Sequence, residues 1–183
     1  MSSKKCETER TLYRDMGRVW LEHIMWVQFL IDCIADENKK TDTIAARVME
    51  VPKDTAAVFL PYYDAKVAAS IEQLITGHLT AGAALFNAIK TRDDEKKERY
   101  KAEILGNADE IAKALAGLNP NYEEQVVRDS LHTAIGLTLH RAEESMAGNY
   151  EEVVKTYARS EDKALETADY LAAGIIKQFP DKF

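Results

Sequence analysis

Apolar residues recur along the chain at intervals of three and four positions, which is the spacing of one face of an α-helix. Long stretches with this pattern are separated by polar joints, several of which contain a proline or a glycine, namely Pro52, Pro61, Gly117 and Gly148. No stretch alternates apolar and polar residues in the manner of a β-strand. We therefore expect long helices over the ranges 8–35, 64–90, 94–116, 120–147 and 150–177.

The joint between the first two long helices is the longest in the chain. A short helix is expected over 42–50, ended by Pro52, and a further helical turn follows Asp54 until Pro61 interrupts it. This joint could form a cap or lid over one end of the molecule. Short joints elsewhere place consecutive helices antiparallel and side by side. We predict an all-α protein, an antiparallel up-and-down bundle of four to five long helices in a single domain over residues 1–183.

Four of the apolar stripes are each interrupted by one side chain that can bind a metal ion. These are His23, His78, His132 and Glu161. Three neutral imidazoles and a carboxylate form a suitable ligand set for Zn²⁺, Fe²⁺ or Mn²⁺. Helical bundles build metal sites from such side chains on facing helices. The spacing places Glu161 a turn or more from the level of the imidazoles, so the four levels need not match.

Three further side chains are candidates to orient these ligands through hydrogen bonds. Tyr157 precedes Glu161 by one turn, Glu22 adjoins His23, and Asn107 flanks the stripe of the third long helix. Each of them is equally consistent with a surface ion pair or an ordinary core hydrogen bond.

Small residues beside two of the imidazoles suggest a pocket. Gly82 follows His78 by one turn, and Gly136 follows His132 by one turn. The missing side chains leave room for water, a small substrate or the edge of a flat cofactor, with Trp20 as a further wall. The alternative is that these glycines only allow helices to cross closely.

Three hypotheses about function follow from this arrangement. The first is a bundle that binds a transition metal ion, or a cofactor containing one, in its core. The second is a scaffold whose core histidines are structural and hydrogen-bond to one another. The third is a pocket for a small molecule whose polar group the histidines bind. The chain has no Glu-x-x-His pair, nucleophile turn or phosphate-binding glycine loop, so we assign no catalytic residue and favour a protein that is not an enzyme.

The charge balance narrows the range of partners. Among 183 residues the formal net charge is −7, which argues against binding nucleic acid or an anionic membrane surface, since both require a basic patch. No apolar run approaches the length of a membrane span, and the first residues are charged where a signal peptide would be apolar. We expect a soluble cytoplasmic protein, and a homo-oligomer or a small-molecule ligand stays open.

Several short motifs occur together across the chain. They are Trp20-x-x-His23-x-x-Trp26, His78-Leu79, Asn107-Ala108-Asp109-Glu110-Ile111-Ala112, Asn119-Pro120-Asn121-Tyr122, Leu131-His132 and Ala168-Asp169-Tyr170-Leu171. In this combination the chain resembles a family of bacterial and archaeal all-helical proteins with no established activity. The resemblance implies a helical bundle over most of the chain. It differs at Gly77, where the family often has Glu, and at Glu161, where the family has His.

Overall fold

The chain folds almost entirely into helices. The computed structural model describes the backbone of residues 2–183 and the side chains of residues 8–183. The long helices are α1 (Ser2–Ala35), α4 (Ala65–Thr91), α5 (Asp94–Leu118), α6 (Glu124–Ala147) and α7 (Tyr150–Gln178). The short ones are α2 (Thr41–Val48), α3 (Val51–Phe59) and the 3-10 helix η1 (Pro180–Lys182). Residues 2–183 contain no strand, which confirms the prediction of an all-α bundle.

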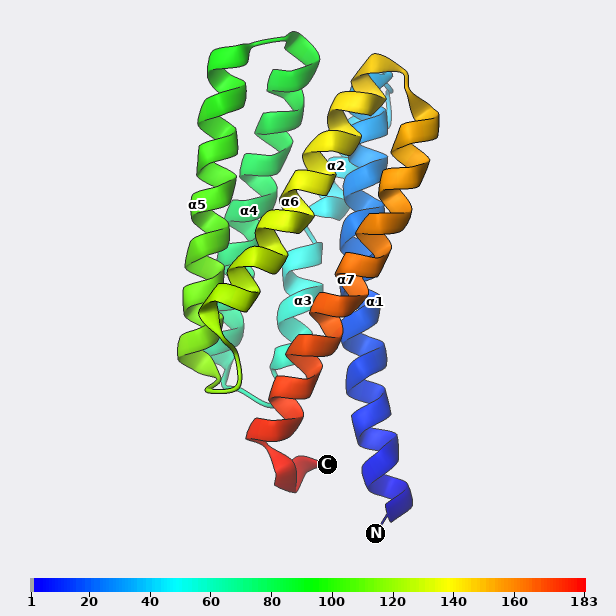
Figure 1. Cartoon of the computed structure of the whole chain (residues 1–183). Helices are drawn as coiled ribbons and strands as arrows, with labels where there is room; N and C mark the ends of the chain where they lie inside the picture. The colour runs from blue at the N-terminus through cyan, green and yellow to red at the C-terminus, as the bar shows by residue number, and fades with distance from the viewer. Residues whose placement is uncertain (1) are drawn as a thin grey trace.

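The long helices form an up-and-down bundle in which α1 packs against α7, α4 against α5, and α6 against both α5 and α7 (Figure 1). Helices α1 and α4 run in the same direction, so the chain between them has to return along the length of the bundle (Figure 1). Helices α2 and α3 make this return while packing against α1 and α4. The expectation that this joint caps one end of the bundle is therefore wrong.

The ends of the helices follow the local sequence. Asp64 caps α4 by accepting a hydrogen bond from the backbone N of Val67 at 2.8 Å. Pro52 lies in the first turn of α3, where proline costs no intrahelical hydrogen bond, so it begins a helix and does not close one as we expected. Helix α6 starts at Glu124, later than expected, because Asn119 and Tyr122 turn inward and are buried before the helix begins.

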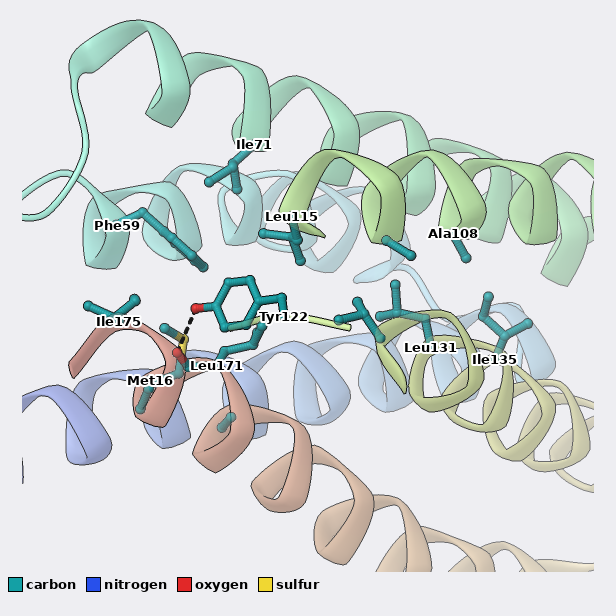
Figure 2. Close-up of a cluster of buried hydrophobic side chains, with 14 of the residues drawn as sticks. Met16, Phe59, Ile71, Ala108, Leu115, Tyr122, Leu131, Ile135, Leu171 and Ile175 are labelled. Atoms are coloured by element: carbon teal, nitrogen blue, oxygen red, sulfur yellow. Dashed lines mark hydrogen bonds between the residues drawn. The ribbon is translucent and has the colours of Figure 1, made fainter. Parts of the chain in front are cut away.

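Buried apolar side chains from α1, α3, α4, α5, α6 and α7 meet in one large core cluster (Figure 2). A second cluster packs Val27, Leu30 and Ile31 of α1 against α2, α3, α4 and α6. None of the helices in the described range is both long and apolar enough to cross a membrane.

We name one end of this core the closed end, and define it by Tyr63, Asn119, Tyr122, Gly174 and Gln178. Hydrogen bonds and close packing hold these residues in place. The hydroxyl of Tyr122 donates to the Leu171 carbonyl at 2.6 Å (Figure 2). The hydroxyl of Tyr63 donates to Gln178 Oε1 at 2.6 Å and accepts from Asn119 Nδ2 at 3.1 Å. The ring of Tyr122 lies directly over Gly174, where a Cβ atom would be 2.0 Å from Cε1 of the ring.

The buried face of α7 differs from the one we expected in its first half. Val154 is 70% exposed, whereas Val153, Thr156 and Ser160 are buried. The hydroxyl of Ser160 bonds the Thr156 carbonyl at 3.0 Å, so it can be buried without an unpaired donor. The buried stripe is therefore shifted by one position there, and this shift changes the position of Glu161.

Candidate functional site

The bundle encloses a cavity of about 400 Å³. Side chains from all seven α-helices line it, and most of them are apolar. Apolar examples from four of these helices are Ile24, Val27, Leu85, Ile104, Leu131 and Ile135. A volume of this size falls within the range of roughly 300–1,000 Å³ that is usual for small-molecule sites.

His78 contributes an oriented imidazole to this cavity. Its Nδ1 lies 3.2 Å from Oδ1 of Asn107 on α5, and Nδ2 of Asn107 donates to the Leu74 carbonyl at 3.2 Å. The amide nitrogen of Asn107 therefore donates to Leu74, and the amide oxygen accepts a hydrogen bond from Nδ1–H of His78. The tautomer of His78 is therefore fixed, and its Nε2 keeps a free lone pair.

His23 faces the same cavity from α1 without such a partner. Its ring stacks on Trp20 with 6.4 Å between ring centres and an interplanar angle of 8°. The ring centre of His78 lies 6.3 Å away, at 59°. The described residues offer the ring nitrogens of His23 no hydrogen bond. The two imidazoles thus form a pair across an otherwise apolar space.

Both imidazoles are neutral in the folded protein at physiological pH. Burial lowers the pKa of His23 from its ordinary 6.5 to about 3, and the charges of His78 and Arg141 add to this effect. Burial also lowers the pKa of His78 to about 4, although its hydrogen bond with Asn107 acts in the opposite direction. Neutral imidazoles can each donate one hydrogen bond and accept another.

Two further polar groups on the cavity wall lack a complete set of hydrogen-bond partners. The indole Nε1 of Trp20 is buried and has no acceptor among the described residues. Thr138 on α6 also lines the cavity, and its Oγ1 accepts a bond from Arg141 Nη2 at 3.1 Å. Unpaired buried donors cost roughly 1–3 kcal/mol each.

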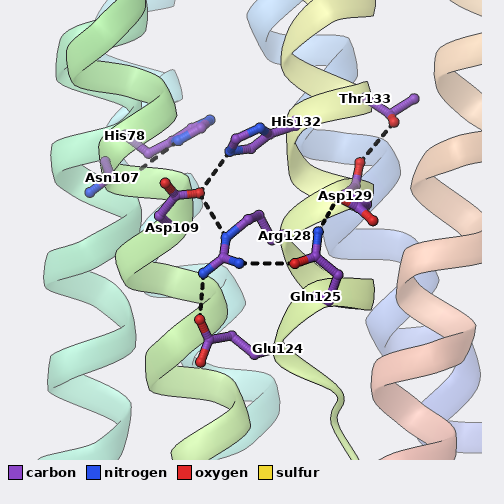
Figure 3. Close-up of polar contacts among 9 residues, drawn as sticks. All are labelled: His78, Asn107, Asp109, Glu124, Gln125, Arg128, Asp129, His132 and Thr133. Atoms are coloured by element: carbon purple, nitrogen blue, oxygen red, sulfur yellow. Dashed lines mark hydrogen bonds and ion pairs between the residues drawn. The ribbon is translucent and has the colours of Figure 1, made fainter.

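His132 lies elsewhere, in a network on the outer face of α5 and α6 (Figure 3). Its Nε2 is 2.8 Å from Asp109 Oδ1, and Arg128 bonds the same carboxylate at 3.1 Å and also Glu124. Asn107 and Asp109 are two positions apart on α5 and so face different ways. The histidines that they hold, His78 and His132, are directed to different sides of α5.

Glu161 is exposed, and its inward position was wrongly predicted. It lines a surface groove between α1 and α7 together with Tyr157 and Glu22. Glu22 forms ion pairs there with Arg18 at 3.2 Å and Arg47 at 3.5 Å, and so does not orient His23. The physical reason is the shifted stripe of α7, which turns Ser160 inward and Glu161 outward.

The residues that we expected to line a pocket are divided between the cavity and the surface. Trp20 and Gly82 line the cavity as expected, whereas Gly136 is exposed and a Cβ added to it would meet nothing within 4 Å. Of the proposed orienting residues, Asn107 holds a cavity histidine, while Tyr157 and Glu22 belong to the surface groove.

The described residues contain no group of three or more His, Cys, Asp or Glu side chains arranged to hold a metal ion. The structure brings together two of the four candidate ligands, His23 and His78. It also adds a cavity residue and a buried cation that the sequence interpretation missed, Thr138 and Arg141. Their spacing at i and i+3 on α6 resembles an ordinary surface stripe, so no local pattern in the sequence marked them.

Comparisons with protein-family models, with curated proteins and with solved structures found no match to this chain.

Proposed function

We propose that this chain is a ligand-binding helical bundle whose cavity takes a mainly apolar small molecule with a polar group. His23 and His78 bind that polar group, and Trp20 forms part of the wall. The observation that carries the proposal is the pair of neutral imidazoles, 6.3 Å apart, on the wall of an apolar cavity of about 400 Å³. The proposal assigns binding and no reaction.

The energetics favour occupancy by a ligand of this kind. Each Å² of apolar surface that a ligand removes from water contributes about 25 cal/mol. Water gains little in the apolar parts of the cavity, because it needs two to four polar partners. A ligand with an apolar body and one polar group matches both parts of the wall, and it also meets the free Nε2 of His78.

The same two imidazoles support a second candidate, a ligand that carries a transition metal such as Zn, Fe or Mn. His78 has the usual arrangement of a metal-binding histidine, with Nδ1 held by Asn107 and Nε2 free. Metal–nitrogen bonds of about 2.0–2.1 Å let one ion bridge two neighbouring rings. The protein would provide only His23 and His78, so the cofactor itself would have to complete the coordination.

The fluorescence of Trp20 offers a direct test of occupancy. The chain has two tryptophans, so Trp26→Phe leaves Trp20 as the only reporter on the cavity wall. We expect titration with dodecanol to change its emission in a saturable way with a Kd in the micromolar range, which corresponds to about 8 kcal/mol. Unchanged emission together with an unchanged melting temperature would refute the proposal and favour structural histidines.

Two variants in the Trp26→Phe background control this test. Ala134→Leu adds bulk to the cavity wall on α6 and should lower dodecanol affinity, whereas Ala102→Leu adds the same bulk on the exposed face of α5. Equal effects of the two would show that dodecanol binds outside the cavity. Elemental analysis of the untagged protein, with and without chelator, separates the metal-carrying candidate from a metal-free ligand.

A further inference from the structure

A buried cation lies next to the cavity. Arg141 on α6 is fully buried, at 0% exposed. Its Nη1 donates to Gln28 Oε1 at 2.8 Å, its Nη2 donates to Thr138 Oγ1 at 3.1 Å, and its Cζ lies 5.2 Å from the centre of the Tyr157 ring. Its Nε is buried and has no partner in the described part of the chain. The guanidinium is therefore held by neutral groups.

No carboxylate among residues 8–183 lies within ion-pair distance of this guanidinium. Asp32 forms no ion pair with it and is linked through Gln28, whose Nε2 donates to Asp32 Oδ1 at 2.7 Å, although the charge of Asp32 acts to raise the pKa of Arg141. Burial lowers the pKa of Arg141 to about 10, so the group is still charged at neutral pH. A buried charge without a direct counter-ion is costly, and the protein is stabilised when an anion approaches it.

Thr138 connects this charge to the cavity. Thr138 lines the cavity and its Oγ1 accepts a hydrogen bond from Arg141, while its own hydroxyl proton has no acceptor in the described residues. By contrast, the helical hydroxyls of Thr55 and Ser160, which also line the cavity, donate to the carbonyl four residues earlier. A cation that donates to a hydroxyl strengthens that hydroxyl as a donor. Thr138 thus presents an available donor, backed by a positive charge, to whatever occupies the cavity.

The imidazole of His23 can also donate a hydrogen bond to an anionic group. His23 is close enough to Arg141 to feel its charge, and its ring nitrogens are unpaired. A neutral imidazole donates one N–H, so His23 and Thr138 together can offer two hydrogen bonds to one anionic group. Most of the rest of the wall is apolar and suits a hydrocarbon chain, and the charged residues Asp64 and Lys66 line it at the start of α4.

We propose that the ligand is an amphipathic acid, with an apolar tail in the cavity and one anionic head group placed at Thr138 and His23 beside Arg141. This inference rests on the proposed function and specifies its substrate class. It also predicts that a cationic head group is excluded from the same position.

Three ligands with the same tail test the charge preference in the Trp26→Phe background at about pH 8, where a carboxylic acid is ionised and an amine is protonated. We expect dodecanoate to bind about tenfold more tightly than dodecanol, and dodecylammonium to bind most weakly. Dodecanol binding without a preference for dodecanoate overturns this inference and leaves the proposed function intact. Absence of binding by all three overturns the proposed function itself.

Variants at Arg141 assign the preference to this side chain. Arg141→Met removes the charge at similar length and should lower dodecanoate affinity about tenfold while dodecanol affinity stays within about twofold. Arg141→Lys keeps the charge and should keep most of the preference. If Arg141→Met binds dodecanoate as tightly as the parent, the assignment is wrong.

A measurement without variants guards against a failure of Arg141→Met to fold. The carboxyl carbon of labelled dodecanoate, bound to the unaltered protein, is followed by NMR as the pH is lowered. A neighbouring cation lowers the pKa of the bound carboxyl below that of the free acid, whereas burial in a purely apolar cavity raises it. A raised value contradicts the inference.

Discussion

At the closed end of the bundle, the Tyr122 hydroxyl donates to a backbone carbonyl, and the Tyr63 hydroxyl both donates and accepts. On the cavity wall, the Trp20 indole has no partner in the described residues and the His23 ring only stacks, and next to the cavity the Nε of Arg141 also has no partner among them. Both regions lie in one bundle and share α7. Paired polar groups at the closed end fix the packing, whereas the polar groups at the cavity leave hydrogen-bonding capacity free for the proposed ligand.

The close packing of the closed end predicts a large loss of stability when Gly174 is replaced by alanine. A Cβ atom there would lie 2.0 Å from Cε1 of Tyr122, so Gly174→Ala has to displace the ring and break its hydrogen bond with Leu171. We expect the free energy of unfolding to fall by about 3 kcal/mol. Urea denaturation measures this loss.

Gly136→Ala is the matched control, because a Cβ at Gly136 meets nothing within 4 Å. Removing a helical glycine should stabilise the protein by about 0.5–1 kcal/mol. If both variants behave alike, close packing does not distinguish the closed end.

The neutral histidines of the cavity predict that stability depends on pH. Below pH 6.5 the unfolded chain protonates His23 and His78, whereas the folded chain does so only near pH 3 and 4. The free energy of unfolding should therefore fall as the pH is lowered from 6.5 toward 4, by up to about 1.4 kcal/mol per pH unit for each histidine. Denaturation across this range measures the slope.

Carboxylates also titrate in this window, so the slope has to be assigned by comparison. His23→Leu and His78→Leu should each remove the share of one histidine and make the protein less sensitive to acid. A slope that neither variant changes would show that these rings are not the groups whose protonation destabilises the fold.

The smallest effect is expected on the outer face, at His132. Its side chain is 36% exposed and its partner Asp109 is 47% exposed, so solvent screens their ion pair. His132→Gln should change the free energy of unfolding by less than about 1 kcal/mol and leave dodecanol affinity unchanged. A large loss of dodecanol affinity would place His132 in the binding site and contradict the separation of the outer face from the cavity.

Much of this fold could be predicted from periodicity alone. Apolar spacing located the long helices, and the same spacing placed His23 and His78 toward the interior, where they meet. The prediction for Glu161 failed because Val154, Tyr157 and Glu161 also follow the i, i+3, i+7 spacing of one helix face, although Val154 and Glu161 are exposed. Thr156 and Ser160 are buried in their place, since hydroxyls bonded within a helix need no other partner.

The burial of Arg141 could not be predicted from the sequence. Arginine is almost never fully buried, so composition and spacing place it on the surface. Its burial depends on Gln28, which lies more than a hundred positions away in the chain and meets it only when α1 and α6 are packed. Pairings of this kind depend on the assembled bundle and leave no local pattern.

The pairing of α1 with α7 also has a consequence for how the protein is made. Helix α1 is synthesised before α7, which packs along it, so the part of α1 that faces α7 stays uncovered until residues 150–178 have been synthesised. Ser160, Ala164 and Leu171 of α7 complete the wall of the cavity. The cavity is therefore complete only once α7 has been synthesised, and a chain stopped short of α7 leaves apolar core side chains exposed to solvent.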